Sequence, residues 1–372
     1  MRNTIERNLH RSRIHLLPRP FNGSVDKSFV ATRTQQQSTD QTLQDAAKSF
    51  YYSYHPDFER ILGPSPTIDL IESRSSSFAH EAGVWVAERN EVWFTAGDAS
   101  LAYLVLDLDT KRVYEPNGTL EDGATLPNLA GGDIFEEHVY FASLGNESLA
   151  EPPSIYAVDI HNHTVRTVLN SYYGLPLNSI DDVSIIRKGP CRGNIFFTSL
   201  DTSAKGPNGR SKALLPNAIY RLDPSKKSLQ AVISRADILA PNGVHATAQS
   251  LYASDAALVA LSGPGSNSSG SPAIYKYDID DDCRPVNKRL FALTRTYISD
   301  GIKVDAYGRV WAAEGEGIVV RDPAGHVLGV FNGAVLDVFG PIGNFALAGK
   351  DLVVLADTRL WVVGLGQDLT GD

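Results

Sequence analysis

Hydrophobic and polar residues alternate along most of the chain from about Thr67 onward, in short runs separated by turn residues. One kind of run ends in small or polar residues, as in residues 91–96 and 194–199. A second kind follows it and usually ends in Asp, as in residues 155–159 and 274–278. Period-two alternation with closely spaced turns is typical of antiparallel strands.

This pair of runs recurs with a period of roughly 45 to 65 residues, and about six copies fit into the chain. Long amphipathic helical patterns are absent from the region. We therefore predict an all-β fold, a six-bladed β-propeller spanning residues 56–372. The aspartates that close the second runs are predicted to be structural, because they lead into hairpin turns; they are Asp159, Asp223, Asp278 and Asp322.

Residues 1–55 have a different character, basic at first and then polar. We predict a tail or surface arm that is partly disordered. Within it, residues 40–50 are predicted to form a short helix with Asp40 as its N-cap. The aromatic residues that follow, at 50–54, are expected to attach the arm to the main body.

The formal net charge of −9 disfavours a nucleic-acid or anionic membrane surface as the main partner. No apolar run approaches the ~20 residues that cross a bilayer, and no signal-peptide pattern is found, so we expect a cytoplasmic protein. A small-molecule substrate is the expected partner, and the oligomeric state is left open. The two cysteines, Cys191 and Cys283, are expected to be reduced, although a pair between them is conceivable.

Short oxygen-bearing side chains stand at the start of four predicted inner strands: Glu81, Asp181, Asn242 and Asp300. Inner strands of a propeller line its central channel, so these side chains should converge at one mouth. Carboxylate and amide oxygens are the ligands that calcium prefers, and magnesium or manganese could replace it. The competing interpretation is that the Asp-Gly and Asn-Gly pairs are ordinary turns.

Two histidines stand close to these residues, His80 beside Glu81 and His245 after Asn242. Either could transfer protons near the channel mouth. The alternative is a structural, hydrogen-bonded histidine, and this alternative is stronger for His245.

These residues resemble the senescence-marker-protein/gluconolactonase/regucalcin-like propellers, and among them the fungal lactonohydrolases. The resemblance covers about residues 57–365, and its landmark segments are residues 78–82, 169–183, 240–244 and 299–310. It implies a six-bladed propeller with one divalent cation, usually calcium, held by Glu81, Asn242 and Asp300. Asp181 stands where the family usually has Asn, as a ligand or substrate contact, and Ser199 replaces a frequent Asp.

The leading hypothesis is a calcium-dependent lactone hydrolase of fungal-type secondary metabolism, in which Asp300, Asp181 or His80 activates a water. Asp300 is the first choice for that base, as the family suggests. A second hypothesis keeps the fold but replaces hydrolysis with a cycloaddition, such as the joining of a tropolone-type quinone methide to a terpene. A third is a non-enzymatic calcium-binding or protein-interaction propeller.

Overall fold

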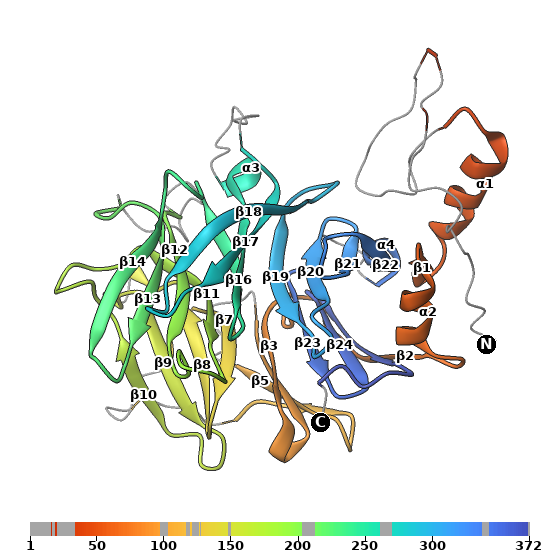
Figure 1. The fold of residues 1–372 in the computed structure, drawn as a ribbon. Coiled ribbons are helices and arrows are strands. Elements are labelled where there is room, and N and C mark those ends of the chain that lie inside the picture. Colours follow the sequence, from red (N-terminus) through yellow and green to blue (C-terminus); the bar gives the residue numbers. More distant parts are fainter. Residues whose placement is uncertain are drawn as a thin grey trace.

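The structure, a computed structural model, describes residues 34–96, 103–116, 128–147, 150–202, 213–260, 270–336 and 342–370, and residues 16, 19, 20, 120 and 126. Six antiparallel sheets follow one another along the chain and form the blades of a propeller (Figure 1). The predicted six-bladed β-propeller is therefore confirmed. Most of residues 1–33, within the arm 1–55 that was predicted to be partly disordered, lies outside the described residues.

The first three blades each consist of four consecutive strands, ordered from the channel outwards. Blade 1 contains β3 (Glu81–Val86), β4 (Glu91–Thr95), β5 (Leu104–Asp107) and β6 (Arg112–Tyr114). Blade 2 contains β7 (Leu129–Phe135), β8 (His138–Ser143), β9 (Ser154–Asp159) and β10 (Val165–Leu169). Blade 3 contains β11 (Ser179–Ile185), β12 (Ile195–Leu200), β13 (Ala218–Asp223) and β14 (Ser228–Ser234).

The other three blades begin in the same way, but two of them also take strands from the N-terminal part of the chain. Blade 4 contains β15 (Pro241–Ala246), β16 (Ser250–Asp255), β17 (Ala273–Ile279) and β18 (Pro285–Leu293). Blade 5 contains β19 (Ser299–Val304), β20 (Val310–Glu314), β21 (Gly317–Arg321) and β22 (Val327–Asn332), with β1 (Tyr51–Ser53) as a fifth strand. Blade 6 contains β23 (Asn344–Ala348), β24 (Asp351–Ala356), β25 (Arg359–Gly364) and β2 (Thr67–Ser73).

The ring is closed by pairing between the two ends of the propeller. Strand β2 lies antiparallel to β25, from Thr67 opposite Gly364 to Ser73 opposite Arg359. The outermost strand of the last blade therefore comes from the residues that precede the first blade. This closure leaves no blade incomplete and holds the six inner strands around one axis.

The arm before the propeller is anchored on blade 5, as the aromatic residues suggested. Helices α1 (Gln37–Ala46) and α2 (Pro56–Leu62) lie beside β22 and β2 (Figure 1). Tyr52 is fully buried, and its hydroxyl donates to Glu316 Oε2 at 3.2 Å. The predicted bounds of the first helix were wrong: Asp40 lies in its first turn and accepts the backbone N–H of Thr34, while Gln36 is the N-cap residue.

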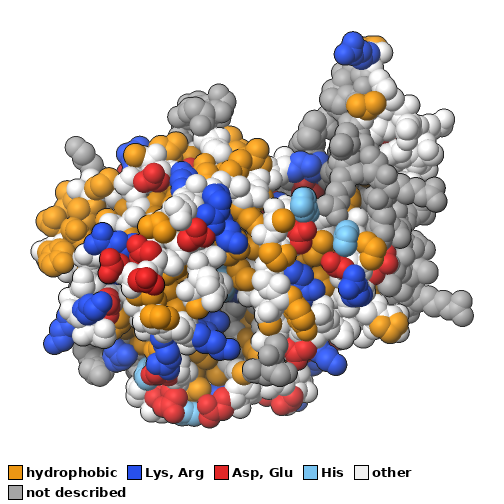
Figure 2. Space-filling view, in the orientation of Figure 1, with side chains coloured by type: hydrophobic (Ala, Val, Ile, Leu, Met, Phe, Trp, Pro, Cys, Tyr) orange, Lys and Arg blue, Asp and Glu red, His pale blue; other side chains and the backbone are white. Residues whose placement is uncertain are grey.

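The remaining helical segments are short connections. They are the 3₁₀ turn Ala87–Arg89 and the helices α3 (Ala257–Ala260) and α4 (Gly333–Leu336). Among the described residues, no helix combines the length and apolar character that crossing a membrane requires. Acidic and basic side chains are interspersed over the face seen in Figure 2 rather than gathered by sign.

The four aspartates that were predicted to be structural lie at the ends of the third strands of their blades, and all four have structural partners. Asp159, Asp223 and Asp322 accept backbone N–H groups two to four residues further along, in the hairpin turns. Asp278 differs, because its carboxylate pairs with Arg289 on the neighbouring strand β18. In none of these places does the carboxylate face the channel mouth.

The two cysteines form a disulfide, so the expectation that both are reduced was wrong. Cys191, between β11 and β12, is bonded to Cys283, between β17 and β18, with a Cα–Cα distance of 5.5 Å. The bond links blades 3 and 4 across 92 residues of sequence. That separation explains why the spacing in the sequence gave no sign of it.

Candidate metal centre

An irregularity in strand pairing recurs in five of the six inner strands, and only β23 of blade 6 pairs regularly. Each of the five uses three residues where its neighbour uses two, so the register shifts within the strand. In blades 3, 4 and 5 the two residues without a pairing partner are Asp181-Asp182, Asn242-Gly243 and Asp300-Gly301. These pairs are thus β-bulges inside inner strands, and not turns. A bulge re-aims a side chain, and the same bulge places Asp181, Asn242 and Asp300 at equivalent positions.

Glycine follows Asn242 and Asp300 because the inner strands approach closely at this level. A Cβ atom on Gly243 would lie 2.0 Å from the carbonyl oxygen of Asp300, on the adjacent strand. A Cβ atom on Gly301 would lie 2.4 Å from Asn344 Oδ1. The bulges on β15 and β19 therefore touch their neighbours through backbone and have no room for a side chain at the second position.

Blade 1 reaches the same channel mouth by a different backbone path. Glu81 is paired with Thr95, one position before the bulge, and not within it. The next residues, Ala82 and Gly83, have φ values of 68° and 65°, in the left-handed region. Such a φ is uncommon for alanine and is typical of backbone held in place by its surroundings at functional sites.

His80, Glu81 and Asp300 converge at this mouth. One potential ligand atom from each of the three lies within 4.8 Å of the others, and all three residues are half-buried. Glu81 is held on both sides: its Oε2 accepts a hydrogen bond of 3.0 Å from the buried Asn344, and its Oε1 lies 3.7 Å from His80 Nε2. Two carboxylates this close disfavour each other's ionised state unless a cation offsets their charge.

Asn242, on the strand next to Asp300, supplies a further oxygen. Its Oδ1 is buried and has no hydrogen-bond partner among the described residues. A buried amide oxygen without a partner costs free energy, so the absence of a donor needs an explanation. Together with the carboxylates of Glu81 and Asp300 it forms an oxygen set of the kind that binds a hard divalent cation such as calcium. The residues present therefore fit such an ion.

The other two predicted site residues, Asp181 and His245, lie elsewhere along the inner strands. Asp181 occupies the bulge position of β11 equivalent to Asn242, but it is not part of the three-residue group that His80, Glu81 and Asp300 form. His245 lies further along β15 and lines the opposite end of the channel. The metal-binding and catalytic roles assigned to these residues from the sequence stay predictions.

Asp357, in the turn between β24 and β25, is a residue that sequence reasoning missed. Its Oδ1 lies 2.7 Å from His80 Nδ1 and also accepts the hydroxyl of Ser77 at 2.9 Å. Because a carboxylate only accepts, Nδ1 of His80 is the donor, and Nε2 is left facing Glu81. No spacing in the sequence links these two residues, which are 277 positions apart.

The charges around His80 shift the pKa values of both His80 and Asp357. Burial lowers the pKa of His80, but the hydrogen bond to Asp357 and the carboxylates of Glu81, Asp357 and Asp300 outweigh it and raise the pKa to about 10. Burial raises the pKa of Asp357, but its hydrogen bond with His80 keeps that pKa below the ordinary value. The arrangement joins a histidine, with one ring nitrogen fixed by a carboxylate, to a potential cation site.

Fold and site together define a class: six-bladed propellers with an acidic, oxygen-lined centre at one mouth of the channel. The family model described as the SMP-30/gluconolactonase/LRE-like region matches residues 79–355. The chain belongs to this family, as its sequence landmarks suggested.

Individual relatives agree with that assignment. The lactonohydrolase oryL of Aspergillus oryzae is 28% identical over 371 residues, covering 92% of this chain and 78% of the relative. A gluconolactonase from Xanthomonas campestris superposes with a TM-score of 0.66 at 21% identity, over 84% of this chain and 94% of that structure. Regucalcin from Agrobacterium tumefaciens, described as a calcium-binding protein, gives a TM-score of 0.54 at 16% identity, over 82% and 94% of the two chains. At such identities the two structural likenesses show the fold alone.

Proposed function

We propose that the protein is a divalent-cation-dependent lactone hydrolase that opens a cyclic ester to a hydroxy acid. The observation that carries the proposal is the convergence of Glu81 and Asp300 with His80 at one channel mouth. The lactonohydrolase relative and the family membership support the reaction class. Calcium is the ion that we propose, because the ligands are oxygens of mixed carboxylate and amide type.

Glu81, Asp300 and Asn242 would hold the ion, with Asp181 as a further ligand or a contact to substrate. When bound, a divalent cation polarises the lactone carbonyl and stabilises the negative charge that develops on its oxygen. Asn344 fixes one oxygen of Glu81, so this carboxylate need not reorganise when it acts. Such fixed second partners typically orient the ligands of metal sites.

The protons of the reaction are assigned to Asp300 and His80. A water oxygen forms the new bond to the carbonyl carbon, and the carboxylate of Asp300 accepts the proton that this water loses. The bond between the carbonyl carbon and the ring oxygen then breaks, and His80 Nε2 gives a proton to that oxygen. The hydrogen bond to Asp357 holds the imidazole in the orientation for this transfer. Asp181 is the alternative base.

The proposal is tested by the hydrolysis of lactones in a pH-stat, with glucono-δ-lactone and a medium-chain δ-lactone as substrates. We expect turnover that is lost after chelation and dialysis and returns with calcium, magnesium or manganese. Asp300→Asn should abolish it, whereas Asp278→Asn, in the third strand of blade 4, should leave it unchanged.

Full activity after chelation, or in Asp300→Asn, would overturn the mechanism. A different outcome would preserve the site but not the reaction: calorimetry shows that the protein binds calcium, yet neither lactone is opened. That result would favour non-hydrolytic chemistry on the same propeller, such as cycloaddition. We propose a small molecule of secondary metabolism as the substrate in either case.

A further inference from the structure

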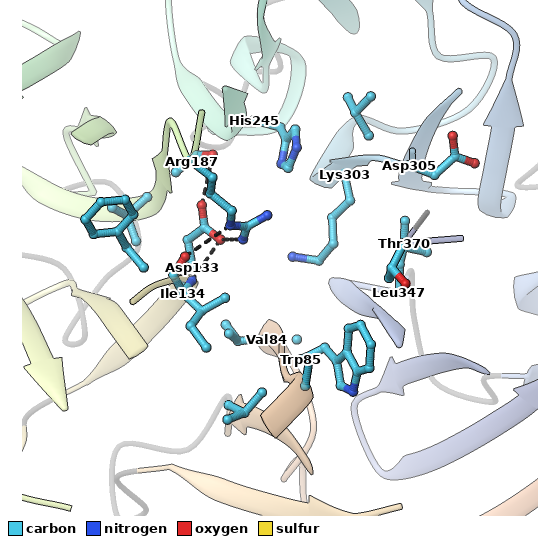
Figure 3. Close-up of a pocket in the computed structure, with 18 of the residues that line it drawn as sticks. Val84, Trp85, Asp133, Ile134, Arg187, His245, Lys303, Asp305, Leu347 and Thr370 are labelled. Carbon is cyan, nitrogen blue, oxygen red and sulfur yellow. Dashed lines mark hydrogen bonds and ion pairs between the residues drawn. The ribbon is translucent and has the colours of Figure 1, made fainter. Parts of the chain in front are cut away.

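The channel has a second mouth, at the other end of the inner strands. A cavity of about 600 Å³ opens there, lined by the later residues of these strands and by the connections that follow them. Figure 3 shows the side chains around it, with the blades arranged about the cavity. The carboxylates of Glu81 and Asp300 do not line it. It is therefore distinct from the candidate metal centre.

Lys303 is the side chain that reaches furthest into this cavity, and its Nζ lies near the middle of Figure 3. That Nζ donates to the carbonyl oxygen of Ala82 at 3.2 Å, and the described residues provide it with no ion pair. Burial lowers the pKa of Lys303, as expected for an ammonium group held inside the channel. An anion placed beside it would favour its charged form.

The other cations around the cavity already have partners. Arg187 forms an ion pair with Asp133 and donates to the carbonyl oxygen of Ile134. Arg192, at the rim, pairs with Glu136. The two charges of the Arg187–Asp133 pair act on the pKa of Lys303 in opposite directions.

Two further titratable groups face the cavity from the inner strands. Asp182 accepts the backbone N–H groups of Val183 and Val244, each at 2.9 Å. Burial lowers the pKa of His245 to about 3, so its ring is neutral and offers one N–H. The cavity thus contains a lysine and a neutral imidazole, and both oxygens of the Asp182 carboxyl group are held by backbone N–H groups.

Part of the cavity wall is apolar, whereas Asp133 and Arg187 lie across the cavity from the Nζ of Lys303 (Figure 3). Val84 and Ile134 lie on one side, and Trp85 and Leu347 on another (Figure 3). Cavities of this size that combine apolar wall residues with polar groups are typical of small-molecule sites. We propose that the second mouth binds a small organic carboxylate with an apolar body, whose charged end pairs with Lys303 and whose body contacts these apolar residues.

Tryptophan fluorescence provides a local readout, because Trp85 is half-buried at the cavity wall. Of the other three tryptophans, Trp93 and Trp311 are fully buried and Trp361 is 8% exposed. Iodide should therefore quench through Trp85 and should do so more strongly than caesium, since Lys303 attracts the anion. Benzoate should protect against iodide, whereas benzyl alcohol, which lacks the charge, should not.

The variant Lys303→Met should lower iodide quenching by about fivefold, the factor expected for losing one nearby charge in a largely aqueous setting. Lys303→Arg should keep it, because guanidinium stays protonated. Lys48→Met, at an exposed position after α1, is the matched control and should behave like the unaltered protein. Chelator-treated protein should show the same iodide quenching, and this result would separate the site from the proposed lactonase centre.

Equal quenching by iodide and caesium in the unaltered protein would overturn the proposal, and so would unchanged quenching in Lys303→Met. If Lys303→Met does not fold, the protection experiment on the unaltered protein decides. Protection by benzoate alone supports the site, and protection by both probes or by neither rejects an anion-binding role.

Discussion

The two mouths of the channel are built by the same inner strands, yet they have opposite chemistry. On β19, Asp300 belongs to the acidic mouth and Lys303 lines the other one; on β15, Asn242 and His245 are divided in the same way. In a regular strand, residues three apart point to opposite faces. The bulge inserts one extra residue between them and brings both to the channel side.

The difference between the mouths teaches that the bulge has two effects. It aims an oxygen at the candidate metal centre, and it sets the phase of the strand for the residues that follow. A candidate cation site and a cationic side chain can therefore lie on the same channel axis without forming an ion pair with the same residue. The charge of Glu81 raises the pKa of Lys303, so the two mouths interact through space. Single substitutions can test how far their functions are separate, beginning with the change of largest effect.

The largest effect is expected for Glu81→Gln, which removes one charge from the candidate centre while preserving the shape of the side chain. Hydrolysis should fall roughly a thousandfold, because weaker cation binding removes several kcal/mol of transition-state stabilisation. Calcium affinity, measured by calorimetry, should fall with it. The iodide quenching that reports the second mouth should change far less, because Glu81 is only one of several charges that act on Lys303.

The matched control is Glu88→Gln, the same substitution at the second mouth, where the Glu88 side chain is 64% exposed. It should leave both hydrolysis and calcium affinity unaltered. Equal losses in the two variants would mean that overall charge matters and that the two mouths are not separate.

Sequence and structure agree to different degrees on the blades, the bulges and the backbone path at Glu81. The six blades were predictable, because alternation and turns are local and repeat along the chain. The bulges were partly predictable: Asn242-Gly243 and Asp300-Gly301 carry a glycine that the close approach of the next strand requires. The different path of Glu81, with Ala82 in a left-handed conformation, has no sign in the pattern because alanine rarely adopts it.

Contacts between distant residues were not predictable. The pair of His80 with Asp357 depends on the closure of the ring, which brings blade 6 against the start of blade 1. The disulfide depends on how blades 3 and 4 lie side by side. In both cases the partners are set by the fold and not by any local rule.

An intermediate effect, on stability, is expected when the disulfide is removed by the double change Cys191→Ser and Cys283→Ser. The bond closes a loop across 92 residues. Its loss should lower the free energy of unfolding by about 2 to 4 kcal/mol, since the unfolded chain gains freedom. Thermal unfolding with and without a reductant should show the same difference for the unaltered protein.

This change also bears on the comparison of the two mouths. Cys191 is adjacent to Arg192, which lines the rim of the second mouth, so iodide quenching is expected to respond while calcium affinity is not. A shift in calcium affinity alone would contradict this placement.

The smallest effect is expected for Asp357→Asn, which keeps the size of the side chain but removes the charge that orients His80. Residues that orient a functional histidine in this way typically contribute 10- to 100-fold to activity, so the rate of hydrolysis should fall by about that factor. The loss should appear in kcat rather than KM, because His80 is assigned to proton transfer and not to substrate binding.

The control for Asp357→Asn is the same substitution in an exposed pair of the same chemistry, Asp322 with His326, where the Oδ2–Nδ1 distance is 3.0 Å. Asp322→Asn should leave kcat unchanged, since that pair lies in a hairpin turn of blade 5. A kcat that is unaltered in Asp357→Asn, with an unaltered pH profile, would remove His80 from the mechanism. The acidic mouth would then consist of a cation site with Asp300 or Asp181 as the sole proton acceptor.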